Sequence, residues 1–165
     1  MKLQKALQLT LLVALILPGS CIVVDTVKPK APESPDEDKL LVLVNEVRSE
    51  GCNCGDDYFP PVDDLVWNDT LEMAAQNHSD DMNENDNLSH TGSDDSDPGD
   101  RLHAVGYEWS TYGENVAVGF SSEEDVIEGW LDSPGHCRNI MNGNVTQMGV
   151  ATSGSYWTQV FAKPK

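Results

Sequence analysis

The end of the sequence contains two strand-like runs joined by a very short turn, and this feature limits the fold most strongly. The runs span 147–153 and 156–162, and only Gly154 and Ser155 separate them. A two-residue loop that begins with glycine is typical of a tight β-hairpin, because glycine readily adopts the positive φ that such turns require. We therefore expect two antiparallel strands, which the rest of the chain must cover with further layers.

Apolar residues recur at helical spacing in three segments before the hairpin. We expect the first helix to be capped by Ser34 and to end at Gly51, the second to begin at Asn68 or Asp69, and the third to begin at Ser122. The apolar stripe of the second helix consists of Leu71, Ala74, Ala75, His78 and Met82. Helices followed by a hairpin, without regular βαβ alternation, predict an α+β layered domain.

The segments between these elements differ in character. We expect 51–61 and the almost wholly polar stretch 83–100 to be loops, and 114–119 to be a short buried strand or turn. Ser133 and Pro134 have the sequence of a helix start, in which the serine side chain caps and proline occupies the first helical position.

The N-terminal part of the chain has the composition of an export signal. Residues 1–20 place two lysines before an apolar stretch that is shorter than the about 20 residues needed to cross a bilayer, which predicts a signal peptide. A proline-rich linker is expected over 21–35, followed by one folded domain over 36–163. The sequence leaves two fates for Cys21: acylation, as in bacterial lipoproteins, or simple cleavage and release.

The strongly acidic composition excludes some classes of partner. The formal net charge is −18 at pH 7, and such a surface repels the phosphates of nucleic acids and of anionic lipids. We expect an exported monomer, extracellular or in the cell envelope, that touches a membrane only through a lipid on Cys21.

Three polar residues at element boundaries are the candidates for a functional site. His90 stands in the long polar loop, Glu114 precedes a buried run, and His136 falls in the first turn of the helix that starts at Ser133. Two neutral imidazoles and a carboxylate can hold zinc with one position open to water. The alternative is a hydrogen-bonded polar cluster without chemistry. We interpret His78 as a core residue and His103 as a surface or structural residue.

Several motifs, in the same order along the chain, carry a resemblance to a known family. The motifs are Asn68-x-x-Leu71-x-x-Ala74-Ala75-x-x-His78-Ser79-x-Asp81-Met82, Ser89-His90-Thr91-Gly92, Gly113-Glu114-Asn115-Val116-Ala117, Trp130-x-x-Ser133-Pro134-Gly135-His136 and Tyr156-Trp157-Thr158-Gln159-x-Phe161-Ala162. Together they resemble the CAP superfamily of cysteine-rich secretory, antigen 5 and pathogenesis-related proteins, most of all its bacterial members. The resemblance implies a three-layer α-β-α sandwich with a central cleft.

In that family two histidines and two acids line the cleft, and zinc sometimes binds the histidines. The resemblance assigns His90 and His136 as the two histidines, and so as possible zinc ligands, and Glu114 as one of the acids. The second acid departs from the pattern of many eukaryotic relatives, because Ser133 occupies its place and Asp132 comes one residue earlier. Glu114 and Asp132 are therefore the candidate catalytic acids, in an incomplete set.

The resemblance also implies a disulfide bond between Cys54 and Cys137, in keeping with export to an oxidising environment. Cys52 is then left over. It could be free, compete with Cys54, or pair with Cys21 if no lipid is attached.

Two functions follow from these expectations. The first is a non-catalytic binding domain whose cleft takes a lipid-like or sterol-like ligand, or a partner at the cell surface. The second is a zinc-dependent, peptidase-like hydrolase in which His90 and His136 hold the metal while Glu114 or Asp132 activates water. The incomplete set of acids and the lack of an activated nucleophile favour the first, so binding without turnover is the expectation.

Overall fold

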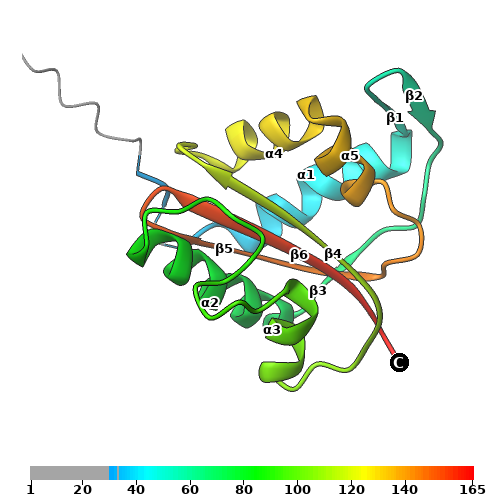
Figure 1. Ribbon diagram of the computed structural model, residues 1–165. Coiled ribbons are helices and arrows are strands. Elements are labelled where there is room, and N and C mark those ends of the chain that lie inside the picture. Colours follow the sequence, from blue (N-terminus) through cyan, green and yellow to red (C-terminus); the bar gives the residue numbers. More distant parts are fainter. Residues whose placement is uncertain (1–29, 33) are drawn as a thin grey trace, which may run out of the picture.

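The computed structural model describes residues 30–32 and 34–165 and shows a central sheet with helices on both faces (Figure 1). The helices are α1 (Glu37–Glu50), α2 (Asp69–Glu84), α3 (Pro98–Ala104), α4 (Glu123–Asp132) and α5 (Pro134–Ile140). The strands are β1 (Cys52–Cys54), β2 (Asp57–Phe59), β3 (Val66–Trp67), β4 (Trp109–Val118), β5 (Gln147–Ser153) and β6 (Tyr156–Pro164).

The main sheet has the strand order β3-β5-β6-β4, and β1 and β2 form a separate small hairpin. Strand β6 pairs antiparallel with both β4 and β5, while β3 runs parallel to β5. The predicted C-terminal hairpin is confirmed, since Ser153 pairs directly with Tyr156 and Gly154 has a φ of 61°. The sheet is therefore built around the element that the sequence indicated most clearly.

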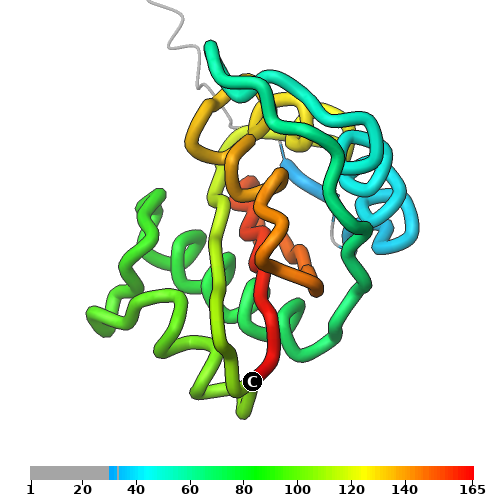
Figure 2. The backbone as a smooth tube through the Cα atoms, turned by 90° about the vertical axis from the view of Figure 1, so that its right-hand side faces the viewer, coloured from blue at the N-terminus to red at the C-terminus, as the bar shows by residue number. Residues whose placement is uncertain are grey.

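The helices divide between the two faces of this sheet, which confirms the predicted α-β-α sandwich. Helices α1, α4 and α5 cover one face, and α2 and α3 cover the other (Figures 1 and 2). Strand β6 is buried on both faces of the sheet. Since successive side chains point to opposite faces, this strand contributes to two separate cores. Trp157 and Phe161 pack in the core under the first group, and Val160 and Ala162 pack in the core under the second.

Helix α2 lies unusually close to the sheet. A Cβ atom on Gly149 of β5 would come within 2.2 Å of the backbone nitrogen of Glu72. The small residues Ala74 and Ala75 on the buried side of α2 allow this approach. Close packing fixes the position of α2 and of the loop that follows it, which carries His90.

Helix boundaries differ from the predictions in two places. Helix α1 begins two residues later than expected, because Asp36 rather than Ser34 caps it by accepting a hydrogen bond from the Lys39 amide. Ser133 does occupy the N-cap position of α5, but in the described part of the chain its side chain makes no capping hydrogen bond. Only its carbonyl takes part, accepting from the Cys137 amide at 2.9 Å.

Three segments contain more regular structure than predicted. The expected loop 51–61 holds the hairpin β1–β2. The expected loop 83–100 is shorter, because α2 continues to Glu84 and a capping box between Asp97 and Asp100 starts α3. The expected short strand 114–119 is the end of the ten-residue β4, which begins five residues earlier, at Trp109.

The last residues of the predicted linker contact the folded domain. The Ala31 amide donates to the Gly154 carbonyl at 2.8 Å, and the Thr152 hydroxyl donates to the Pro32 carbonyl at 2.7 Å. The predicted signal peptide, Cys21 and the rest of the linker up to residue 29 lie outside the described residues. Within the part of the chain that the structure describes, no helix has the length and apolar character needed to span a bilayer.

Candidate functional site

The carboxylate of Glu114 is the centre of a buried ion-paired cluster. Its side chain is only 2 % exposed and points from β4 toward the segment between α2 and α3. The His90 Nδ1 lies 2.9 Å from its Oε1, and the Arg101 Nη2 donates to its Oε2 at 2.7 Å. Burying a carboxylate is costly unless it is paired, and here both oxygens have a partner.

Arg101 is a member of this cluster that the sequence analysis missed. It stands on α3 and also donates to the carbonyls of His90 at 3.0 Å and Ser96 at 2.9 Å. These bonds tie the polar loop to both α3 and β4. A sequence signal existed, because Arg101 is the only lysine or arginine between Arg48 and Arg138. A lone cation in so acidic a segment is a good candidate for a buried ion pair.

His78 is a buried core residue, as predicted, and it also borders the cluster. Its Nε2 donates to the Ser89 carbonyl at 2.8 Å and lies 3.9 Å from Oε1 of Glu114. Burial lowers the pKa of His78 below its ordinary value, although the charge of Glu114 acts in the opposite direction. Within the described residues its Nδ1 has no hydrogen-bond partner. His78 is therefore a neutral imidazole at neutral pH.

His90 and His136 are both more accessible than the buried His78. The side chain of His90 is 53 % exposed, and because its Nδ1 donates to Glu114, its Nε2 is the nitrogen with a free lone pair. Burial and then the charge of His90 lower the pKa of His136.

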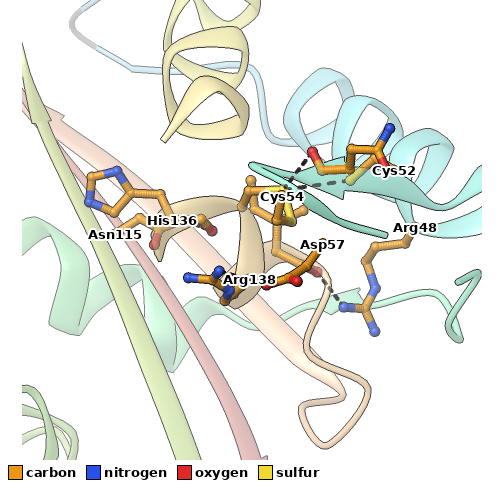
Figure 3. The surroundings of a disulfide bond; sticks show 10 residues. Arg48, Cys52, Cys54, Asp57, Asn115, His136 and Arg138 are labelled. Atoms are coloured by element: carbon orange, nitrogen blue, oxygen red, sulfur yellow. Dashed lines mark hydrogen bonds and ion pairs between the residues drawn. A yellow bond between two sulfur atoms is a disulfide. The ribbon is translucent and has the colours of Figure 1, made fainter. Parts of the chain in front are cut away.

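Helix α5 is held against β4 through two asparagines, and this places His136. The Asn115 Nδ2 donates to the His136 carbonyl at 3.2 Å. The Asn139 Nδ2 donates to the Asn115 Oδ1 at 2.9 Å and to the Glu114 carbonyl at 3.0 Å. Figure 3 shows His136 beside Asn115, at the start of α5. The Gly-Glu-Asn motif thus contributes a carboxylate to one side of the site and an anchor for the second histidine to the other.

Asp132 is not part of this arrangement. It is exposed at the end of α4 and lines a different, open hollow of about 320 Å³ together with Asp125 and Glu128. Of the two candidate catalytic acids, the structure therefore places only Glu114 beside a histidine.

The donor set offers zinc two imidazole ligands and lacks the third protein ligand of a catalytic centre. Among the described residues, the ligand atoms of His90, Glu114 and His136 do not all lie within 4.8 Å of one another. Both oxygens of Glu114 are already bonded to His90 and Arg101. Glu114 therefore orients the first histidine through its bond to Nδ1.

A pocket of about 250 Å³ adjoins the buried cluster on the side of α2 and α3. His78 and Arg101 form part of its wall, and Asp81 and Asp94 stand on α2 and in the loop. Its lining side chains are polar or charged apart from Gly92 and Ala104. This pocket therefore suits a small polar group better than an apolar ligand.

The disulfide between Cys54 and Cys137 is confirmed, and it joins β1 to α5 across 83 residues of sequence. Among the described cysteines Cys52 is free. His103 is a surface residue as predicted, with its ring 5.5 Å from that of Trp109.

The sandwich fold and the histidine–glutamate site define the class of protein to which the chain belongs. The model of the cysteine-rich secretory protein family, CAP, matches residues 43–161. The chain belongs to this family.

Two Bacillus subtilis proteins are related in sequence. The uncharacterized protein YkwD is 38 % identical over 99 residues, which cover 59 % of this chain and 38 % of YkwD. The uncharacterized membrane protein YlbC is 29 % identical over 147 residues, which cover 84 % of this chain and 40 % of YlbC. The chain thus spans about two fifths of the length of these curated relatives.

Solved structures agree with the fold. An extracellular SCP-domain protein of Bacillus anthracis has a TM-score of 0.67 and 29 % identity, covering 76 % of this chain and 39 % of that protein. An outer surface protein of Borrelia burgdorferi has a TM-score of 0.65 and 23 % identity, covering 80 % of this chain and 98 % of that protein. Both neighbours are extracellular or surface proteins.

Proposed function

We propose that this protein is an exported, non-catalytic binding domain that recognises an extracellular or cell-surface partner through the face carrying His90 and His136. The observation that carries the proposal is the state of Glu114. Both of its oxygens are bonded, to His90 at 2.9 Å and to Arg101 at 2.7 Å. A general base must lie within reach of the proton that it abstracts. The side chain of Glu114 is only 2 % exposed, and moving it toward a substrate would break the buried ion pair with Arg101.

The chemistry of the neighbouring pocket supports a polar partner over a lipid. Asp81, Asp94 and Arg101 line it, and its volume of about 250 Å³ is small for a sterol-sized ligand. Sites that bury most of an apolar ligand are lined mainly by hydrophobic and aromatic side chains. A polar partner therefore fits this pocket, whose wall includes His78 and Arg101, better than an apolar ligand does.

Metal-dependent hydrolysis is the second candidate, and one observation favours it. A carboxylate that accepts from Nδ1 of a histidine, leaving Nε2 outward, is the usual support for a metal ligand. Glu114 and His90 have this arrangement. Against hydrolysis stand the missing third ligand and the distant Asp132. We therefore place metal-dependent turnover second.

One set of variants separates the two candidates. The double variant His90→Ala/His136→Ala removes the exposed imidazole of His90 and the half-buried imidazole of His136. His103→Ala is the control because His103 is an exposed histidine on α3. Binding is measured as the fraction of protein that sediments with isolated Bacillus subtilis sacculi. We expect the double variant to lose this binding and the control to keep it.

Turnover of peptide and ester substrates is measured on the same proteins, with added zinc and with a chelator. We expect no chelator-sensitive turnover. Zinc-dependent turnover that disappears in the double variant and persists in His103→Ala would overturn the binding proposal in favour of the hydrolase. Equal sedimentation of the wild type and the double variant would show that the face carrying His90 and His136 takes no part in binding.

A further inference from the structure

Three cysteine sulfurs gather where the small hairpin β1–β2 meets α5. Cys52 and Cys54 lie two residues apart on β1, so their side chains point to the same side of the strand. Cys137 is on α5, and the three sulfur atoms all lie within 4.8 Å of one another. The disulfide therefore has a free thiol as its direct neighbour.

The free thiol of Cys52 lies near the sulfur of Cys137, which is the atom bonded in either possible disulfide. The Sγ atoms of Cys52 and Cys137 are 3.6 Å apart, while Cys137 is bonded to Cys54. Attack of a thiolate on a disulfide sulfur is the general route by which disulfides exchange partners. At this separation the Cys52 sulfur is already in van der Waals contact with the sulfur that it would attack.

The structure holds Cys137 firmly and leaves the hairpin with fewer attachments. At the start of α5, Asn115 donates to the His136 carbonyl; at its end, the buried Arg48 donates to the carbonyls of Ile140 and Asn142. The β1–β2 hairpin is not part of the main sheet. Besides the disulfide, the hairpin contacts α5 through the Cys137 Sγ and the Asn53 carbonyl at 3.8 Å and through the exposed ion pair of Arg138 with Asp57. The first contact is long and the second is exposed, so we take β1 as the element that shifts, together with both of its cysteines.

We propose that Cys52, Cys54 and Cys137 form an intramolecular thiol–disulfide exchange site in which Cys137 pairs with either cysteine of β1. In the step, the Cys52 thiol loses its proton, its sulfur forms a bond to Cys137 Sγ, and the bond between Cys137 and Cys54 breaks. The Cys54 sulfur leaves with the electron pair and takes up the proton. One thiol and one disulfide are present on both sides, so no oxidant or reductant is consumed.

Chain entropy does not choose between the two isomers. They close loops with sequence separations of 83 and 85, which differ negligibly in closure entropy. The two isomers differ instead in the burial of the cysteine that is left free. Cys54 is fully buried and Cys52 is partly exposed. The exchange therefore moves the free thiol from a partly exposed position to a buried one, and so controls its access to thiol reagents.

The test uses the full chain with Cys21→Ser as the parent, so that Cys21 cannot contribute a thiol. The parent is incubated at mildly alkaline pH without any added thiol and is then unfolded in denaturant at mildly acidic pH with N-ethylmaleimide, which labels free thiols. Bound thiols are then reduced and alkylated with iodoacetamide. Because only Asn53 separates the two cysteines, tandem mass spectrometry must locate the maleimide.

We expect the maleimide on both Cys52 and Cys54 of the parent, with Cys52 the major site. Maleimide on Cys52 alone, after any time of incubation, would overturn the proposal. The variant Cys52→Ser controls for scrambling during the procedure, because it has no free thiol and should carry no label.

The variant Cys54→Ser gives an independent readout. We expect it to form a disulfide between Cys52 and Cys137 and to contain no free thiol. Two free thiols in a Cys54→Ser protein whose circular dichroism is that of the parent would contradict the exchange. If this variant fails to fold, the labelling of the parent still decides.

Discussion

Two regions of this molecule attach peripheral segments to the same sandwich, but by different physical means. On one side, Arg101 and His90 hold the polar loop and α3 to Glu114 of β4 through charged hydrogen bonds. On the other, a disulfide holds the β1–β2 hairpin to α5. The first attachment depends on burial of charge and on protonation, and the second on the redox state of sulfur. A substitution can therefore remove the charged attachment and leave the disulfide in place, or the reverse.

The largest effect is expected on the covalent side. Cys137→Ser removes both possible disulfides, and opening a loop with a sequence separation of 83 should lower the free energy of unfolding by about 4.5 kcal/mol on the chain-entropy estimate. Urea unfolding of the purified proteins measures this. Cys54→Ser should cost clearly less, because Cys52 can replace Cys54. Equal losses in the two variants would show that the second pairing does not stabilise the fold.

A somewhat smaller effect is expected on the charged side. Arg101→Met leaves the buried carboxylate of Glu114 without its cation, and breaking a buried pair in this way typically costs about 3 kcal/mol or more. The free energy of unfolding in urea is again the measurement. Wild-type stability in Arg101→Met would mean that the ion pair contributes no more than a surface pair does.

The two regions should also differ in their response to pH. Burial lowers the pKa of His78 below its ordinary value of 6.5, so the unfolded chain binds a proton more readily than the folded one. Stability is then fully present above about pH 6.5 and is lost as the pH falls toward the lower pKa of the folded state. His136 adds to this loss, since burial and then His90 lower its pKa as well.

Unfolding measured at several pH values below 6.5 should therefore show a shallower decline in His78→Gln, which keeps a donor for the Ser89 carbonyl. His103→Gln is the control on an exposed histidine. An unchanged slope in His78→Gln would contradict the assignment of this residue as a buried neutral imidazole. The slope in Cys54→Ser should match that of wild type, because β1 contains no histidine.

The smallest effect is expected for the ion pair beside the disulfide. Arg138 and Asp57 are 3.1 Å apart and both side chains are well exposed. Water screens such a pair, so Arg138→Met should change the free energy of unfolding by about 0 to 1 kcal/mol. A loss of unfolding free energy as large as that in Arg101→Met would contradict the expectation that a buried ion pair stabilises the fold more than an exposed one.

The elements that could be predicted are those with a local signal. The hairpin around Gly154 and the caps at Asn68 and Ser122 follow from residue types at short spacing, and the structure contains all three. The β1–β2 hairpin and β3 were not predicted. Strands this short have no periodicity of their own and form only because partners from elsewhere lie beside them.

The candidate site was predictable in part for the same reason. His90, Glu114 and His136 carry motif signals, whereas Arg101 has none beyond its isolation in an acidic stretch. Asp132 looked suitable because it stands one residue before Ser133, the place that an acid occupies in many eukaryotic relatives. The short break between α4 and α5 sends its side chain to a different surface.

The sequence by itself determined the layered class of the fold, the C-terminal hairpin, the acidic surface and the family, because hydrophobic spacing, turn residues and motif order are local properties of the chain. Only the tertiary structure decided which charges are paired and which sulfurs are neighbours. Glu114 meets Arg101, and Cys52 meets Cys137, through contacts between elements distant in sequence. Such contacts depend on how the packed layers bring their surfaces together, and burial then sets how strongly each pair interacts.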